Sequence, residues 1–139
     1  MTTTVLAFDF GTRKIGAASG QSLTGSGTPL PALPCRDGIP DWQQVAALLA
    51  EWQPTLLLVG LPLNMDGTDS ELAKRARRFA GRLQGRFGKP VQLIDERLST
   101  REARERLGDS YRGGSDPRVD SMAAVLLIES FFRDGAPAP

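Results

Sequence analysis

The feature that most limits the folds open to this chain is an apolar run in mid-chain, Thr55–Val59, which has the length of one strand. Its residues do not alternate between apolar and polar side chains, as they would in a strand with one solvent-exposed face. Continuous apolar runs of this length are typical of parallel strands that are covered on both faces. The run therefore indicates an interior parallel strand of an α/β sheet.

Extended segments before this run predict an antiparallel part of the same sheet. Val5–Phe10 has the length and composition of a strand, a Gly11-Thr12 turn follows, and Lys14–Ser19 forms a second candidate strand. Together they indicate a hairpin. A third segment, Thr28–Pro34, contains three prolines, which cannot donate to a sheet ladder. We therefore expect it at a sheet edge.

Helical patterns flank the apolar run. Asp41 is suited to cap a helix that runs to about Trp52, where Pro54 stops it. After the run, apolar residues recur at spacings of four and three and predict a long amphipathic helix: Leu72, Ala76, Phe79, Leu83 and Phe87. The two helices would cover the sheet.

The last third of the chain continues the alternation of strand and helix. We expect a short buried strand at Val91–Ile94, a helix that begins near Ser99, and a final helix from about Pro117 to Phe132. The complete order predicts an α/β fold with a mixed five-stranded sheet, three antiparallel strands followed by parallel strands, and helices on both faces. A length of 139 residues fits one domain, residues 1–134, with a disordered tail at residues 135–139.

Composition removes several kinds of chemistry. The sequence has no histidine and a single cysteine, Cys35, so Ser-His-Asp hydrolysis, histidine-ligated zinc and multi-thiolate metal sites are excluded. Any hydrolysis must use carboxylates, lysines, hydroxyls or a hard metal ion bound through oxygen. The lone cysteine and the lack of an apolar stretch of membrane length lead us to expect a cytoplasmic protein without membrane contact.

Basic residues are concentrated in one segment, although the formal net charge is only +1. Between Leu72 and Ile94 there are seven basic residues and no acidic one. On the predicted helix four arginines form a stripe beside the apolar one: Arg75, Arg78, Arg82 and Arg86. Such a stripe can follow a phosphate backbone. The alternative is a solvated helix face.

Two acidic positions lie at predicted strand ends. Asp9 ends an apolar strand, where a carboxylate is costly unless it is paired, and it is either an Asx-type turn residue or a metal ligand. Glu96 follows Asp95 at the carboxyl end of a strand, where open α/β sheets usually place functional groups. The alternative for either acid there is a salt bridge to Arg97 or Arg101.

Asp120 lies on an otherwise apolar helix. It shares a side with Ala124, Leu127 and Phe131, so we expect it to face a core. It is not needed as a cap, because Asp116 is suited to cap the helix and Pro117 to be its first residue. The alternative is a first-turn acid stabilised by the helix dipole. Three separated acids, Asp9, Glu96 and Asp120, could meet in one cleft, bind two hard cations and support phosphodiester hydrolysis without histidine.

Four segments resemble one known family in sequence and order: Asp9–Gly16, Val59–Gly67, Asp95–Thr100 and Val119–Val125. This is the YqgF family, the bacterial Holliday-junction-resolvase-like group also described as candidate pre-16S rRNA nucleases. The resemblance implies an RNase H-like fold, catalysis by Asp9, Glu96 and Asp120 with Mg2+ or Mn2+, and processing of the 5′ end of the 16S rRNA precursor in ribosome biogenesis.

Substrate contacts are expected around these acids. Candidates to orient the nucleic-acid backbone are Thr12, Arg13, Lys14, Asn64, Arg97, Arg75, Arg78 and Arg82. For Asn64 the alternative is turn chemistry within the Asn64–Gly67 loop. Expected partners are nucleic acid, as pre-rRNA or branched DNA, and ribosomal particles, and the chain is expected to be a monomer or homodimer.

Three other functions stay open at this point. A Holliday junction resolvase acting on branched DNA would use the same acids and fold. A nucleotide-binding ATPase or kinase is suggested because residues 9–12 also resemble the phosphate loop of actin-like proteins, although those close a cleft between two such domains. A non-catalytic nucleic-acid-binding module would keep the fold without cleavage.

Overall fold

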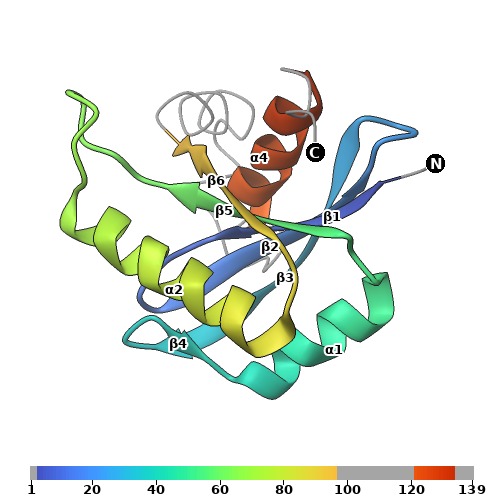
Figure 1. The fold of residues 1–139 in the computed structure, drawn as a ribbon, viewed down its shortest axis with the longest axis horizontal. Helices are drawn as coiled ribbons and strands as arrows, with labels where there is room; N and C mark the ends of the chain where they lie inside the picture. The colour runs from blue at the N-terminus through green and yellow to red at the C-terminus, as the bar shows by residue number, and fades with distance from the viewer. Residues whose placement is uncertain (1–2, 97–120, 134–139) are drawn as a thin grey trace, which may run out of the picture.

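The computed structural model describes residues 3–96 and 121–133, and these residues form a mixed β-sheet with helices on its two faces (Figure 1). The strand order is β4-β3-β2-β1-β5-β6. The strand bounds are Thr4–Asp9 (β1), Lys14–Gln21 (β2), Ser26–Arg36 (β3), Ile39–Pro40 (β4), Leu56–Leu61 (β5) and Val91–Asp95 (β6). β1, β2 and β3 are antiparallel neighbours, whereas β5 runs parallel to both β1 and β6. The mixed sheet is confirmed.

The apolar run in mid-chain is an interior strand, as predicted. β5 lies between β1 and β6, and its residues Leu57, Leu58 and Val59 are fully buried. β6 differs from the prediction of a buried strand, because each of its residues is only half-buried. The reason is its position at the edge of the described sheet, where it has one neighbouring strand.

A short sixth strand, β4, was missing from the predicted five. Asp37 and Gly38 have φ angles of 52° and 78°, and they join β3 to β4 in a two-residue hairpin turn. Positive φ at both central residues is the geometry that Asp-Gly favours. β4 pairs only with Cys35 and Arg36, so most of β3 forms a sheet edge, as its prolines predicted.

Two of the described helices begin where a side chain caps them. Asp41 accepts a hydrogen bond of 2.9 Å from the Gln43 backbone N–H at the start of α1 (Trp42–Trp52). Ser70 does the same for Ala73, also at 2.9 Å, at the start of α2 (Glu71–Phe87). α4 spans Met122–Arg133. The expected helix near Ser99, the expected helix start at Pro117 and the tail at 135–139 lie outside the described residues.

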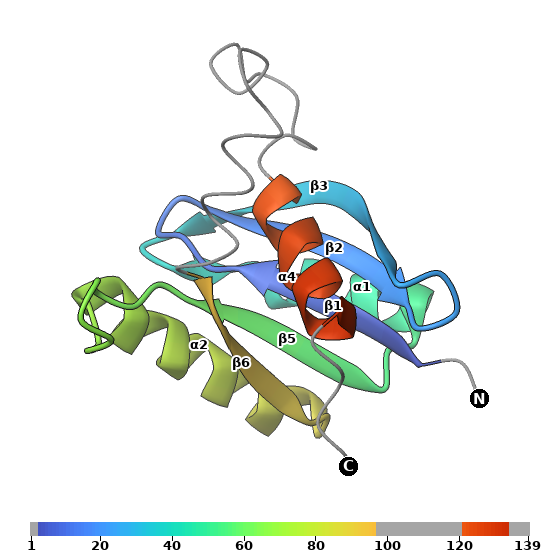
Figure 2. The ribbon, with the colours of Figure 1, turned by 90° about the horizontal axis from the view of Figure 1, so that it is seen from above.

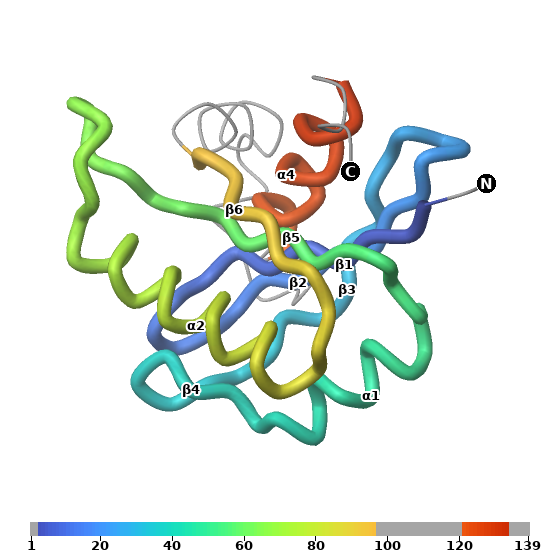
Figure 3. Tube along the Cα trace, in the orientation of Figure 1, coloured from blue at the N-terminus to red at the C-terminus, as the bar shows by residue number. Residues whose placement is uncertain are grey.

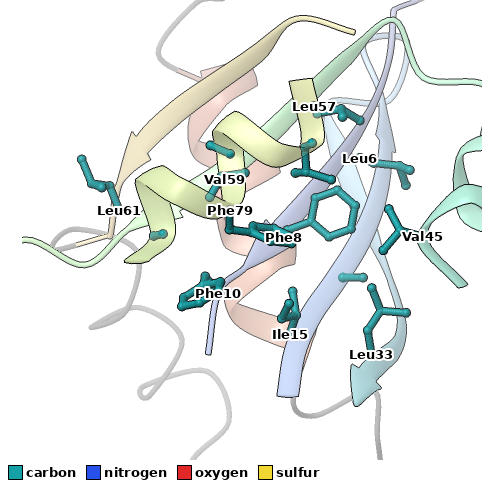
Figure 4. Packing of buried hydrophobic residues seen from close by; sticks show 14 of the residues in the cluster. Leu6, Phe8, Phe10, Ile15, Leu33, Val45, Leu57, Val59, Leu61 and Phe79 are labelled. Carbon is teal, nitrogen blue, oxygen red and sulfur yellow. The ribbon is translucent and has the colours of Figure 1, made fainter. Parts of the chain in front are cut away.

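The sheet separates two hydrophobic cores, and each core is covered by helices. α1 and α2 cover one face of the sheet, and α4 covers the other (Figure 2). On the α2 face, Phe79 packs against Phe8 and Phe10 with ring centroids 5.8 Å and 5.4 Å apart (Figure 4). On the α4 face, Val5 and Ala7 pack against Ile128 and its neighbours. No helix in the described part of the chain is long and apolar enough to cross a membrane.

Strand alternation then decides which side chains share a face. Val5 and Ala7 belong to the α4 core, whereas Leu6, Phe8 and Phe10 belong to the α2 core. Because successive side chains point to opposite faces, Asp9 lies on the α4 side. The parallel strands β1, β5 and β6 all end at the same end of the sheet, where the chain leaves β5 toward α2 (Figure 3). Two of the predicted functional acids, Asp9 and Glu96, lie at this end.

Candidate active site

Two of the predicted acids meet at the carboxyl ends of the parallel strands. Asp9 is the last residue of β1, and Glu96 directly follows β6, two strands away. Their carboxyl groups are joined by a side-chain hydrogen bond, in which Glu96 donates to Asp9. Glu96 is only 7% exposed. Residues far apart in sequence therefore form one carboxyl pair.

Gly60 makes room for this pair. β5 lies between β1 and β6, so the Glu96 side chain must reach across it toward Asp9. A Cβ atom on Gly60 would stand 2.3 Å from Oε1 of Glu96 and 2.7 Å from its Cδ. Sequence reasoning assigned no role to Gly60. The available signal was a glycine inside a buried apolar strand, which often marks a close approach of another group.

The electrostatics of the pair favour a bound cation. Burial, the hydrogen bond to Asp9 and the nearby acids raise the pKa of Glu96 to about 10. Burial also raises the pKa of Asp9, and the hydrogen bond from Glu96 opposes this shift. Without a cation the two buried carboxyls therefore hold a proton between them. A divalent cation would stabilise both as carboxylates.

The donor atoms fit a hard cation. Carboxylate oxygens are the ligands that Mg2+ and Mn2+ prefer, and Oε1 of Glu96 is buried without a hydrogen-bond partner among the described residues. The described residues contain no group of three side chains suited to hold a metal. The third predicted acid, Asp120, lies outside them.

Ser121, which follows Asp120 in sequence, is hydrogen-bonded to two neighbouring strands. Its side chain is fully buried, and Oγ accepts a hydrogen bond of 3.1 Å from the Ala17 N–H and donates one to the Leu30 carbonyl. Ala17 and Leu30 are register partners of β2 and β3, next to an irregularity in that ladder. The hydroxyl thus bridges the two strands. Sequence reasoning missed this role, although a serine at the start of an apolar helix was visible.

The β1–β2 turn presents exposed polar side chains beside Asp9. Thr12, Arg13 and Lys14 are all exposed, and their contact with substrate stays a prediction. The turn is tight, since a Cβ on Gly11 would stand 2.5 Å from the Lys14 carbonyl oxygen. The structure brings these three predicted residues next to Asp9, whereas Arg97 lies outside the described residues.

Asn64 takes part in a loop of its own. Its N–H donates to the Thr68 carbonyl at 2.8 Å, and its Nδ2 donates to the Thr68 hydroxyl at 3.1 Å. Asp66 accepts a further hydrogen bond from the Thr68 N–H at 3.0 Å. These bonds agree with the alternative of turn chemistry. A substrate contact by Asn64 stays a prediction.

The arginine stripe of α2 divides into two groups. Arg75 bonds the carboxylate and the carbonyl of Asp37 at 2.6 Å and 2.7 Å, and Arg86 lies over the Trp42 ring at 4.4 Å. Arg78 and Arg82 are exposed and form no ion pair with any described residue. All four lie on the α2 side of the sheet, opposite Asp9. The structure therefore does not bring the stripe and the acids into one concave face.

Comparisons with known proteins show what this chain is similar to. The model of a family described as RuvX, Holliday junction resolvase, matches residues 3–134. The chain is 64% identical over 132 residues to a candidate pre-16S rRNA nuclease of Alcanivorax borkumensis, covering 95% of this chain and 97% of the relative. It is 55% identical over 137 residues to a protein of the same name from Escherichia coli, covering 97% and 99%.

A solved structure shares the fold at low sequence identity. RuvC of T. thermophilus, in complex with a Holliday junction substrate, aligns with a TM-score of 0.56 and 18% identity over 96% of both chains. This likeness confirms the predicted RNase H-like fold, in which the sheet has six strands in place of five.

Proposed function

This chain belongs to the RuvX family of Holliday junction resolvases, and we propose that it is a metal-dependent nuclease that processes the 5′ end of the 16S rRNA precursor. Membership makes the protein a hydrolase of phosphodiester bonds. The observation that carries the metal-dependent mechanism is the buried, hydrogen-bonded pair of Asp9 and Glu96. The single domain proposed for residues 1–134 would contain the whole site.

The proposed metal is Mg2+ or Mn2+. Asp9 and Asp120 would bind it directly, and Glu96 would complete the site. When bound, such cations activate water and stabilise the entering and leaving oxygens of a phosphodiester. The residues of this chain would hold the cation and position the substrate. Asp9 and Glu96 provide oxygen donors, the strands hold them in place, and Thr12, Arg13, Lys14 and Arg97 orient the substrate backbone.

The placement of Ser121 supports the assignment of Asp120. Ala17, which Ser121 contacts, follows Gly16 in β2, and Gly16 is the register partner of Asp9. Ser121 itself therefore lies near the Asp9 end of β1, and this position supports the proposal that its sequence neighbour Asp120 serves the same site.

RNA is the proposed substrate because the relatives that match nearly the whole chain at 55–64% identity are named for pre-16S rRNA. The second candidate is a Holliday junction in DNA, which the family description favours. We place the activity in the cytoplasm, on precursor ribosomal particles, with the chain as a monomer or homodimer.

One experiment tests both the chemistry and the substrate. The purified protein is incubated with a 16S precursor that carries its 5′ extension, or with a four-way DNA junction, in Mg2+, in Mn2+ or in EDTA. We expect metal-dependent cleavage of the RNA at a defined position, and loss of that cleavage in Asp9→Asn and Glu96→Gln. Glu51→Gln, which neutralises an exposed acid on α1, is the matched control and should cleave normally.

Two outcomes would contradict these proposals. Cleavage of the junction together with an intact precursor would refute the RNA assignment and support the second candidate. RNA cleavage that persists in both acid variants would refute the proposed site.

A further inference from the structure

A polar cavity of about 180 Å³ lies between the β3–β4 turn and α2. Its walls are the Asp37–Gly38 turn, the side chains of Phe10 and Ile39, and three arginines of α2. Phe10 is nearly buried and lies against the turn, so close that a Cβ on Gly38 would stand 2.7 Å from its Cζ. The cavity therefore has a buried aromatic wall on one side and cationic side chains on the other.

The charge of the cavity is strongly positive. Three arginines, Arg75, Arg78 and Arg82, face one carboxylate, Asp37, which leaves an excess of two positive charges. Arg75 is held by two hydrogen bonds to Asp37, whereas Arg78 and Arg82 have no ion-pair partner among the described residues. The last two are four positions apart on one helix, so their guanidinium groups can reach the same ligand. An anion is the ligand that this arrangement suits.

The cavity is connected to the active site through two hydrogen-bonded turns. The Gly38 N–H donates to the Thr12 carbonyl at 2.9 Å, and the Cys35 N–H donates to the Arg13 carbonyl at 2.9 Å. The β3–β4 turn is therefore fixed to the β1–β2 turn, which immediately follows Asp9. Phe10 links the two sites directly, because it lines the cavity and is the next residue after Asp9.

From these observations we infer that the cavity is a subsite for a backbone phosphate of the nucleic-acid substrate, away from the phosphate that is cut. The strand would be cut on the α4 face at Asp9, cross the sheet end over Thr12, Arg13 and Lys14, and place a later phosphate between Arg78 and Arg82 on the α2 face. Guanidinium groups bind phosphate oxygens through paired, charge-assisted hydrogen bonds. The subsite thus reads the backbone and not the base sequence.

This subsite rests on the proposed function for its ligand, but its test does not need cleavage. Binding of a fluorescent single-stranded RNA is measured in EDTA at several salt concentrations for the wild type and for the double variant Arg78→Gln/Arg82→Gln. The control, Lys74→Gln/Arg77→Gln, removes the same charge from the same helix outside the cavity, where those residues pair with Glu71 and Asp69. Thermal unfolding verifies that both variants remain folded.

We expect the cavity variant to weaken binding about tenfold or more, and to lower the salt dependence by about one phosphate contact. The control should stay within about twofold of the wild type. Equal weakening in both variants would show a general charge effect and overturn the subsite, as would unchanged binding in the cavity variant or no RNA binding by the wild type.

Inorganic phosphate serves as a second probe, since a free anion could bind the same groups. We expect it to compete only weakly with RNA. If it bound the wild type more tightly than the oligonucleotide, and lost that binding in the cavity variant, the cavity would be a free-phosphate site and the inference would be wrong. Loss of cleavage in the Asp9→Asn variant with normal RNA binding leaves the subsite intact, so the two proposals fail separately.

Discussion

The carboxyl group of Glu96 lies directly over Gly60, in space that no other residue type would leave free. An added Cβ at position 60 would be 2.3 Å from Oε1 and 2.8 Å from Cγ of Glu96, well inside van der Waals contact. Gly60 sits on β5, between the strands that supply Asp9 and Glu96. The missing side chain therefore permits the two acids to meet above the central strand.

Replacing Gly60 by alanine should separate the pair without removing a carboxylate. We expect Gly60→Ala to lower divalent-cation affinity and cleavage by about 10–100-fold, the usual effect of disturbing a residue that orients a metal ligand. Titration calorimetry with Mn2+ and a cleavage assay measure the two effects. Gly81→Ala is the control, because an added Cβ there meets nothing within 4 Å and should only stabilise α2. Unchanged cation affinity in Gly60→Ala would contradict the proposed geometry.

The raised pKa of Glu96 predicts how stability depends on pH in the absence of metal. The folded-state pKa of about 10 lies above the 4.5 of an ordinary glutamate, so the folded protein keeps a proton that the unfolded chain loses. Stability from this proton is fully present below pH 4.5 and is lost progressively as pH rises toward 10. The raised pKa of Asp9 acts in the same direction.

We therefore expect Glu96→Gln to be more stable than the wild type at pH 8 in EDTA, and similar to it near pH 4. Urea unfolding at both pH values measures the difference. Asp69→Asn is the control: Arg77 lowers the pKa of Asp69, so its contribution is lost only as the pH falls and should not change between pH 5 and 8. A wild-type stability that rises from pH 5 to 8 while Glu96→Gln stays level would refute the assigned protonation.

Ser121 should matter for activity because it holds the start of α4 on the sheet. Ser121→Ala leaves the Ala17 N–H and the Leu30 carbonyl without their partner, at a cost of about 1–3 kcal/mol. We expect cleavage to fall further than this loss of stability explains, since Asp120 is the adjacent residue. The comparison is Leu127→Ala, a fully buried α4 residue whose truncation costs about 2–5 kcal/mol without affecting the bridge.

Activity is compared at a temperature where both variants are fully folded by circular dichroism. Leu127→Ala should retain near-normal cleavage and Ser121→Ala should not. Equal activities would show that Ser121 contributes to stability alone.

The β3–β4 turn can be altered without removing a charge from the arginine cavity. Gly38→Ala introduces a clash with Phe10 and places alanine at a φ of 78°, which costs about 1–3 kcal/mol. We expect weaker RNA binding in EDTA because the turn and Asp37, which holds Arg75, must move. Gly25→Ala has a similar φ of 67° but open space around it, so it should lose stability and bind RNA normally. Fluorescence anisotropy distinguishes the two, and identical binding by both would exclude a role for the turn.

Local patterns predicted most elements because periodicity and capping depend on neighbours in sequence. The helix after Asp41, the helix with apolar residues from Leu72 to Phe87 and the first hairpin all appear where expected. β4 was missed because two residues are too short to show a period, although the Asp37-Gly38 pair carried the turn signal. The burial of β6 was overestimated, because an apolar composition does not reveal whether a strand has one neighbour or two.

The arginine stripe shows that local sequence patterns are also incomplete as a guide to function. Its spacing was visible in the sequence, but the partners that hold Arg75 and Arg86 come from the β3–β4 turn and from α1. Their positions depend on how distant segments pack, so only the structure separates these two arginines from Arg78 and Arg82.

The sequence alone predicted the kind of chemistry: without histidine, and with acids at the ends of apolar strands, oxygen ligands for a hard cation were the remaining choice. It also determined the local elements that carry those acids. Only the tertiary structure decided that β5 separates β1 from β6, that Glu96 reaches Asp9 across Gly60, and that the arginines occupy the opposite face. The physical reason is that strand order and side-chain approach arise from contacts between distant segments, whereas periodicity reports only what neighbouring residues prefer.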